Sequence, residues 1–600
     1  MLFPVLALLL FGCANVVAPT GGPRDEDPPV VLRSEPPNFS PNFSGGEVRI
    51  YFDEFVELRN VRQQLMISPP LETNPDFRVR GRSVVFGIEE DLRENTTYSI
   101  FLGDAIRDIT EGNAIPNFRF VFSTGDHVDS LSVRGKVLDA FTMEPVKDVF
   151  VMMYDNVYDS VPYLERPTYL AKTDGDGKFS IGNMREGDYL MFGLVDNNAN
   201  YLYDLPEERI AFIDSLVRPD YVPPPVVPEP GREADEAAAD EAGREGVDAE
   251  ASGLADPAED VPGPGEEGPD ETAAETPGLA DPGPVSYTLY LFQEADTVQR
   301  ITGAEVIRKG QLRITFRVPF ESVKVEDVRQ ELPDDWYIME TNPRRDTLWM
   351  WMRDPQPDSL FLAVSDSYRV LDTLKLSGRP RPARGRTAQD EEVAPPPPVQ
   401  LTMDGLRRNT WPFYRPVTFR SSSPSDSLNA ELISVWLADT VPLDVPFEFT
   451  DDVRRTFRLA IEPEEEQNYT VEFLPGAVTD IFGASNDTIS RSFTTTAASD
   501  YGKLIMNIEL PAPDRQYILQ LLDREGKTLQ QKIMSENGQY SFPHLDAGTY
   551  GLRLIEDRNG NGKWDPGNYL NGITPEPVYM YPDQLQVRQN WELEMPWRPQ

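Results

Sequence analysis

Short runs in which hydrophobic and polar residues alternate recur along most of the chain, separated by Pro, Gly and Asn. Val48, Ile50 and Phe52 form one such run, and a similar run spans residues 312–316. Alternation with a period of two places every second side chain on one face of a strand, and turn residues between such runs are typical of antiparallel sheets. The pattern therefore predicts an all-β protein built from several tandem β-sandwiches.

A different pattern opens the chain. Residues 2–11 are an apolar run of ten residues, about half the length that a membrane-spanning helix needs and suited to the core of a signal peptide. The run ends in Leu-Phe-Gly-Cys13, which resembles the lipobox of bacterial lipoproteins, where the cysteine is lipidated. Cys13 is also the only cysteine, so it has no partner for an intrachain disulfide. We expect a signal peptide at 1–12, a lipid on Cys13 and a flexible tether over 13–27.

One internal repeat has an offset of 371 residues. Tyr98 corresponds to Tyr469, and Phe122 corresponds to Phe493. The first copy also has Asp108 followed by a Gly-Asn pair, which together resemble the closing turn and strand of the SbsA-type bacterial Ig-like domain. The resemblance implies Ig-like domains at 28–126 and 400–497.

A second repeat has an offset of 361 residues and pairs 174–204 with 535–565 without a gap. Its glycine-rich turns and strands resemble the transthyretin-like or carboxypeptidase-regulatory-like domain. The resemblance implies one such sandwich at 129–218 plus 285–294 and another at 498–600.

The first of these two sandwiches is interrupted by 219–284, an acidic stretch of Pro, Glu, Ala and Gly. Its composition predicts a disordered insertion within one domain, since a long loop costs little extra closure entropy. Residues 295–377 are predicted to form a further β-rich sandwich, and 378–399 a linker.

Charge and histidine content limit the function. With 100 acidic and 56 basic residues the net charge is −44, which argues against a nucleic-acid partner. His127 and His544 are the two histidines, too few for a histidine metal triad and poorly placed for a nucleophile-base pair. A hydrolase with paired carboxylates stays open on the sequence alone, but no motif indicates one. We therefore predict no catalytic residues.

One motif has the oxygen-ligand spacing of a calcium loop. The candidate ligands are Asp557, Asn559, Asn561, Lys563 and Asp565. The other repeat copy gives a weaker candidate, with Tyr201 where the turn glycine stands in the stronger copy; its residues are Asp196, Asn198, Asn200 and Asp204. Alternatively, both segments are turns in which Asp and Asn bond their own backbone without metal.

Two further features have both a functional and a structural interpretation. Trp349 and Trp351 share one face of a predicted strand, either as an aromatic platform for glycans or as packed side chains. Nine Asp-[Ser/Thr]-aliphatic triplets resemble the O-glycosylation motif of Bacteroidota, although Asp-Ser and Asp-Thr also suit turns. The acceptors would be Ser130, Ser215, Thr297, Thr347, Ser359, Thr373, Ser427, Thr440 and Thr488.

The order of these parts resembles the multidomain Ig-like lipoproteins of Bacteroidota, which implies an outer-membrane lipoprotein, with surface exposure favoured over a periplasmic orientation. Two functions follow from different classes of protein. One is a non-catalytic scaffold that binds an envelope protein, an outer-membrane β-barrel being one candidate, with calcium stiffening its domains. The other is a glycan- or peptide-binding surface lipoprotein. Exposure of Trp349 and Trp351 would favour binding, and their burial would favour the scaffold.

Overall fold

The computed structural model describes residues 25–221, 286–296, 298–329, 331–333, 335–353, 359–377 and 397–600. The predicted signal peptide, Cys13, nearly all of the acidic insertion, Thr297 and most of the linker lie outside these residues. Within them almost every element is a strand, so the all-β prediction is confirmed. The helical elements of this part are α1 (Val61–Gln64), α2 (Val161–Leu164), η1 (Ala430–Leu432) and η2 (Ala498–Asp500).

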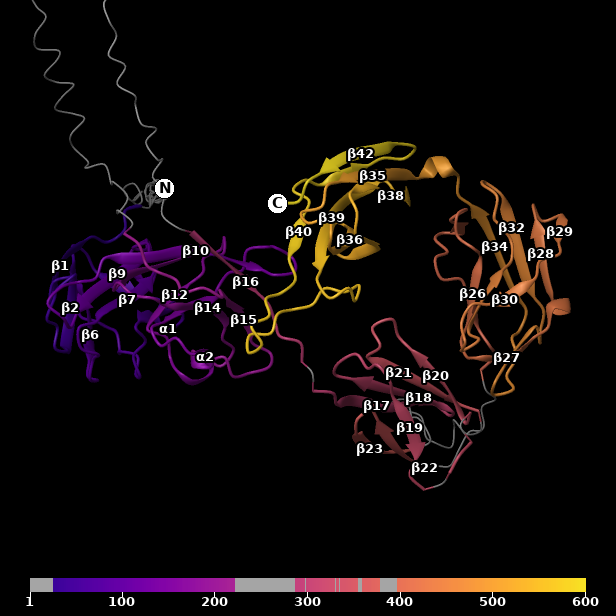
Figure 1. The fold of residues 1–600 in the computed structure, drawn as a ribbon, viewed down its shortest axis with the longest axis horizontal. Helices are drawn as coiled ribbons and strands as arrows, with labels where there is room; N and C mark the ends of the chain where they lie inside the picture. The colour runs from indigo at the N-terminus through magenta and orange to yellow at the C-terminus, as the bar shows by residue number, and fades with distance from the viewer. Residues whose placement is uncertain are drawn as a thin grey trace, which may run out of the picture. The chain divides into compact units, whose positions relative to one another are not determined.

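The described strands form five β-sandwiches that fall into two compact units (Figure 1). The first unit extends to Asp139 and continues over Glu144–Leu291. The second comprises Ala140–Met143 and Phe292–Gln600. Each sandwich has its own cluster of buried hydrophobic side chains, so each can be stabilised by its own core.

The first sandwich has sheets of order β1-β2-β6-β5 and β4-β7-β9, together with the pair β3-β8. Its strands are β1 (Val31–Glu35), β2 (Gly46–Phe52), β3 (Val56–Leu58), β4 (Met66–Ser68), β5 (Arg78–Val79), β6 (Ser83–Ile88), β7 (Thr97–Gly103), β8 (Ile106–Asp108) and β9 (Phe118–Ser123). The alternating residues Val48, Ile50 and Phe52 of β2 all point into the core.

The fourth sandwich repeats this topology, with sheets β24-β26-β31-β30 and β25-β34-β32-β28-β29 and the pair β27-β33. Its strands are β24 (Leu401–Thr402), β25 (Thr410–Trp411), β26 (Thr418–Ser421), β27 (Ser425–Leu428), β28 (Ile433–Leu437), β29 (Val441–Leu443), β30 (Phe447–Phe449), β31 (Thr456–Leu459), β32 (Asn468–Phe473), β33 (Val478–Asp480) and β34 (Ile489–Thr495). Strands β25 and β29 are additions to the plan of the first sandwich.

The second sandwich has sheets of order β13-β10-β16 and β12-β11-β14-β15. Its strands are β10 (Leu131–Asp139), β11 (Phe150–Tyr154), β12 (Tyr169–Lys172), β13 (Lys178–Met184), β14 (Leu190–Val195), β15 (Arg209–Phe212) and β16 (Ser286–Leu291). β16 pairs in parallel with β10, so the strands on either side of residues 222–285 belong to one sandwich. The two backbones approach closely at Gly135, where a Cβ would lie 2.1 Å from the carbonyl oxygen of Tyr287.

The fifth sandwich has the same strand order as the second, in sheets β38-β35-β42 and β37-β36-β39-β40, with β41 also paired to β39. Its strands are β35 (Gly502–Ile508), β36 (Gln516–Leu522), β37 (Thr528–Met534), β38 (Gly538–Leu545), β39 (Gly548–Asp557), β40 (Val578–Met580), β41 (Leu585–Val587) and β42 (Glu592–Trp597). Its last strand, β42, lies parallel to β35, as β16 lies parallel to β10.

The third sandwich has a topology of its own, with sheets β17-β18-β21-β20 and β19-β22-β23. Its strands are β17 (Ile301–Arg308), β18 (Gln311–Phe316), β19 (Lys324–Asp327), β20 (Tyr337–Thr341), β21 (Thr347–Met352), β22 (Ser359–Ser365) and β23 (Val370–Ser377). Among the described residues of all five sandwiches, no helix is both long and apolar enough to cross a bilayer.

Candidate functional site

The stronger calcium candidate is a loop that leaves the end of β39. Asp557 is the last residue of that strand, and its carboxylate is turned back into the loop. Its Oδ1 accepts the backbone N–H groups of Gly560 and Asn561 at 2.7 and 3.1 Å, and its Oδ2 accepts that of Gly562 at 2.8 Å. Gly562 has φ 75°, a conformation that costs glycine little. One buried carboxylate therefore organises the turn.

The other predicted ligands converge on Asp565. Its Oδ2 accepts the side-chain amides of Asn559 and Asn561, the latter at 2.7 Å. The amide oxygen of Asn561 accepts the backbone N–H of Lys563 at 2.8 Å, and that of Asn559 accepts the N–H of Asn561 at 3.0 Å. The structure thus brings the five predicted residues together, with Lys563 taking part through its backbone.

Glu576, which the sequence did not single out, closes this loop. It precedes β40, and only 5% of its surface is exposed. Its carboxylate accepts the backbone N–H groups of Arg558 at 2.8 Å and of Asp565 at 3.0 Å. Burial raises the pKa of Glu576, and the nearby charges of Asp565 and Asp557 raise it further, although these two hydrogen bonds act in the opposite direction. Three carboxylates therefore belong to this loop.

The weaker candidate, after β14, has the same arrangement. Asp196 accepts the N–H of Tyr201 at 2.8 Å, and the amides of Asn198 and Asn200 donate to Asp204 at 3.0 and 2.9 Å. Tyr201 adopts φ 63°, so the backbone turns there without glycine. Its ring packs on Phe150 at 5.3 Å, which helps to hold a conformation that is unfavourable for tyrosine.

Glu208 is the counterpart of Glu576 in this copy. It is fully buried and accepts the backbone N–H groups of Asn197 at 3.1 Å and of Asp204 at 3.0 Å. In each copy a buried glutamate just ahead of the next strand thus bonds the loop. Neither Glu208 nor Glu576 was predicted, because neither stands at a ligand position of the calcium-loop motif.

Hydrogen bonds satisfy both loops in this conformation. Within the described ranges, no three His, Cys, Asp or Glu side chains are grouped closely enough to hold a metal ion. To bind a cation, Asp565 would have to exchange the two asparagine amides for the ion. The metal-free turn accounts for every bond described above, and calcium binding stays a prediction.

Trp351, one of the two proposed platform tryptophans, lies where the third and fourth sandwiches meet. Its ring is 1% exposed, and its Nε1 donates to Glu340 at 2.9 Å. The guanidinium groups of Arg308 and Arg455 lie 5.3 and 5.0 Å from the ring centroid. Trp349 is half-buried. Of the two alternatives, Trp351 is therefore a packed side chain, although it packs against charged groups on the outer face of its sheet and not within the hydrophobic core.

Glu340 of β20 links the same two sandwiches. Its Oε1 accepts from Arg420 at 2.8 Å, and its two oxygens accept Nη1 of Arg455 at 2.9 and 2.7 Å. The side chains of Glu340 and Arg455 are 11% and 16% exposed. A largely buried ion pair thus lies beside the buried tryptophan.

The first sandwich has its own buried polar turn. Asp108 is 1% exposed and accepts the backbone N–H groups of Glu111, Gly112 and Asn113 at 2.6, 3.0 and 2.7 Å. Burial disfavours the charged form, but the hydrogen bonds together outweigh it, so the pKa of Asp108 is lowered. Asp480 of the fourth sandwich likewise accepts two backbone N–H groups of its turn.

Residues 25–124 match the family described as "Bacterial Ig-like domain". The first sandwich is a bacterial Ig-like domain. Among curated proteins, no match to the chain is found.

Solved structures of low similarity align over larger parts of the chain. The pilin subunit BcpA of Bacillus cereus shares 10% identity, covering 78% of this chain and 99% of that one, with a TM-score of 0.14. Domains 1–6 of the surface layer protein SbsC share 10%, covering 89% and 66%, with a TM-score of 0.12. Alpha-2-macroglobulin domains of Escherichia coli share 13%, covering 44% and 95%, with a TM-score of 0.17. Scores this low carry no argument about function.

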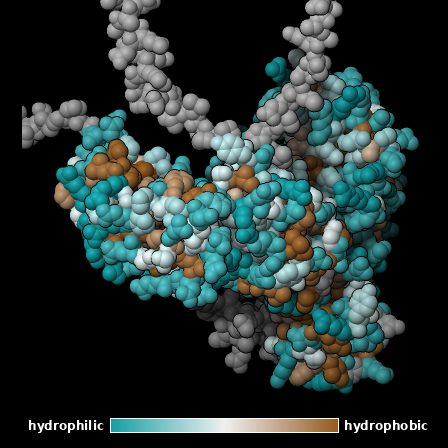
Figure 2. All heavy atoms as spheres, turned by 60° about the vertical axis from the view of Figure 1, so that its left-hand side comes forward, coloured by the Kyte–Doolittle hydropathy of each residue, from teal (hydrophilic) through white to brown (hydrophobic). Residues whose placement is uncertain are grey.

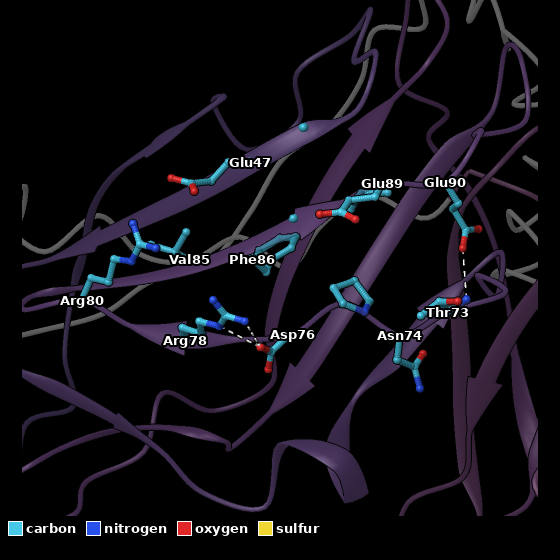
Figure 3. Close-up of a pocket in the computed structure, with 14 residues that line it drawn as sticks. Glu47, Thr73, Asn74, Asp76, Arg78, Arg80, Val85, Phe86, Glu89 and Glu90 are labelled. Atoms are coloured by element: carbon cyan, nitrogen blue, oxygen red, sulfur yellow. Dashed lines mark hydrogen bonds and ion pairs between the residues drawn. The ribbon is translucent and has the colours of Figure 1, made fainter.

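The Ig-like domain also has an open hollow of about 640 Å³ beside β5 and β6 (Figure 3). Its charged side chains are largely engaged. Asp76 pairs with Arg78 at 2.7 Å, and Glu90 accepts the backbone N–H of Thr73 at 3.1 Å. The hollow is therefore a polar surface depression in which Asp76, Arg78 and Glu90 already have partners.

The predicted glycan acceptors among the described residues lie at or near the surface. Six are exposed: Ser130, Ser215, Thr373, Ser427, Thr440 and Thr488. Thr347 and Ser359 are half-buried, and Thr297 lies outside the described residues. Position alone therefore permits modification at the six exposed acceptors.

Proposed function

We propose that this protein is a lipid-anchored outer-membrane lipoprotein that acts as a non-catalytic scaffold for an envelope partner. The bacterial Ig-like domain and four further β-sandwiches support the scaffold. The resemblance of Leu-Phe-Gly-Cys13 to a lipobox supports the anchor. An outer-membrane β-barrel is the partner that we favour, with the chain on the cell surface.

The joint between the third and fourth sandwiches is the observation that carries the scaffold proposal. Trp351, Glu340 and Arg455 contact one another there, and all three side chains are largely buried. Bending at this joint would separate Glu340 from Arg455 and leave a buried charge unpaired, which is unfavourable. A joint made of a tryptophan and a hydrogen-bonded ion pair therefore resists bending. A stiff spacer needs such joints.

The alternative, a glycan- or peptide-binding lipoprotein, depended on an exposed pair of tryptophans. Burial of Trp351 removes one of the two rings from any such platform. Trp349 alone is half-buried and offers one partial face. The scaffold is therefore the better-supported function.

Calcium would stiffen the second and fifth sandwiches under this proposal. Asp557 and Asp565 would supply carboxylate oxygens, and the asparagines amide oxygens, which are the ligands that calcium prefers. In the other copy Asp196 and Asp204 would do the same.

The anchor is tested by Cys13→Ser in the native host. We expect the wild type in the membrane fraction with a lipid mass on the mature N-terminus, and the variant unprocessed or released. A variant processed and sedimenting like the wild type would disprove the anchor.

Crosslinking in gently solubilised membranes tests the scaffold, which predicts a stoichiometric protein partner. Repeated recovery of the wild type alone, or with glycan only, would disprove the scaffold.

A further inference from the structure

Four large apolar side chains are exposed near one end of the bacterial Ig-like domain. We call them the basal patch: Val30, Leu32, Phe55 and Ile109, which are 57%, 65%, 54% and 56% exposed. Most other large apolar residues of this domain are buried in its core. Figure 2 shows one face of the molecule, which is hydrophilic over most of its area and has separate apolar patches.

Strand pairing places these side chains near one another. β3 and β8 pair with Val56 opposite Asp108, and just beyond them Ile109 donates its N–H to the carbonyl of Phe55 at 3.2 Å. Asp53, two residues before Phe55, donates its N–H to the carbonyl of Val30 at 3.1 Å. Leu32 follows on the edge strand β1, where the pairing register shifts.

The chain enters the domain at this end. The side-chain amide of Asn113 donates to the backbone carbonyls of Asp25 and Asp27 at 3.0 and 3.2 Å, which holds the incoming segment beside the loop that follows Ile109. Cys13 lies twelve residues before Asp25. Twelve residues span at most about 40 Å when fully extended. A lipid on Cys13 would therefore keep this end of the domain close to the bilayer.

The charged groups beside the patch have both signs: the guanidinium of Arg82 lies 5.1 Å from the centroid of the Phe55 ring, and several carboxylates surround Glu54. Burial, followed by the carboxylates of Asp108, Asp53, Asp25 and Glu111, raises the pKa of Glu54. A surface that carries a guanidinium beside carboxylates is compatible with zwitterionic headgroups, which also carry both signs.

We propose that the basal patch rests on the zwitterionic lipid surface that holds the Cys13 anchor, a step that depends on the anchoring proposed above. Phe55 and Ile109 enter the boundary between headgroups and acyl chains, where aromatic and aliphatic side chains are favoured. The anchor supplies the membrane attachment, and the patch fixes the orientation of the first domain.

Phe55→Trp reports this contact, and Phe39→Trp is its control. Phe39 is 55% exposed, against 54% for Phe55, but it lies beside Val121 in the middle of β9. The full lipidated protein is placed on phosphatidylethanolamine-phosphatidylcholine liposomes whose acyl chains carry bromine near the headgroup. Fluorescence is compared with that of the wild type, whose eight tryptophans give the background.

We expect bromine to quench the tryptophan of Phe55→Trp and of a second reporter, Ile109→Trp, and to leave Phe39→Trp at the wild-type level. Equal quenching at all three positions, or at none, on protein that floats with the liposomes would overturn the patch and leave the anchor intact. Protein that carries no lipid and does not float would overturn the anchor and the patch together.

Discussion

The ring of Tyr98 stacks on that of Phe122, its partner across β7 and β9, with centroids 5.3 Å and planes 10° apart. The hydroxyl of Tyr98 accepts the backbone N–H of Arg93 at 2.9 Å. In the fourth sandwich Tyr469 stacks on Phe493 at 5.7 Å and accepts the N–H of Glu464 at 3.1 Å. A tyrosine that bonds the backbone a few residues upstream is a recurrent stabilising device of Ig-like sandwiches.

Tyr98→Phe removes this hydrogen bond and leaves the stack. We expect the first sandwich to lose about 0.5–1.5 kcal/mol, as one hydrogen bond contributes. Calorimetry of the full chain should show one transition lowered, by about 4–8 °C for each kcal/mol. Tyr290→Phe, at an exposed position of β16, is the control. Equal shifts in both variants would show that the bond is unimportant.

Asp108 should make the stability of the first sandwich depend on acid pH. Its folded pKa lies below the value of about 3.9 expected for an unfolded chain. Ionised Asp108 therefore stabilises the fold above that value, and the contribution is lost as pH falls through the folded pKa. Asp108→Asn should lower the free energy of unfolding of the first sandwich by about 1–3 kcal/mol at pH 7 and by less at pH 3. The transition to follow is the one that Tyr98→Phe identifies. An equal loss at both pH values would contradict the assignment.

Glu340→Gln should loosen the joint between the third and fourth sandwiches. It removes the charge that pairs with Arg455 and Arg420, at a cost of about 1.5–3 kcal/mol for a charged hydrogen bond. Hydrogen exchange of the full chain should become faster in β20 and β31. Glu448→Gln breaks an exposed ion pair with Arg458 and should change little. Unchanged exchange in Glu340→Gln would indicate that Trp351 alone maintains the joint.

Calcium should stabilise the fifth sandwich by mass action, about 2.7 kcal/mol at a hundredfold excess over its dissociation constant. We expect the melting transition of this sandwich to fall when chelator replaces calcium, and Asp557→Ala with Asp565→Ala to abolish that difference. Asp523→Ala serves as control, because Asp523 also bonds backbone N–H groups of a turn, at 2.9 Å. Wild-type melting that is the same in calcium and in chelator would show that hydrogen bonds alone hold the loop.

Glycosylation would be recognised by intact mass. Protein purified from its native host should exceed the mass of polypeptide plus lipid by whole glycan units, at no more than the exposed acceptors and Thr297. Replacing Thr373, Thr440 and Thr488 with alanine should remove three of those units. A native mass equal to polypeptide plus lipid would rule the modification out.

The repeats made the sandwiches predictable, because Tyr98 and Tyr469 keep one spacing and alternation defines the buried face of each strand. Glu208 and Glu576 were not predictable from ligand spacing. Glu208 follows Asp204 by four residues, whereas Glu576 follows Asp565 by eleven, so the ungapped repeat ends before them. A signal existed, since both copies place an acid one or two residues ahead of the next strand. The burial of Trp351 depends on a neighbouring sandwich, which local periodicity does not encode.

The parallel pairing of β10 with β16 has a mechanical consequence. Six residue pairs, from Arg134 with Ser286 to Asp139 with Leu291, fasten the strands that flank 222–285. Tension along the chain would bypass those 64 residues for as long as the ladder holds. Once it yields, on the order of 200 Å of further chain length would become available at about 3.3–3.6 Å per residue, so this ladder would set the force at which the chain lengthens.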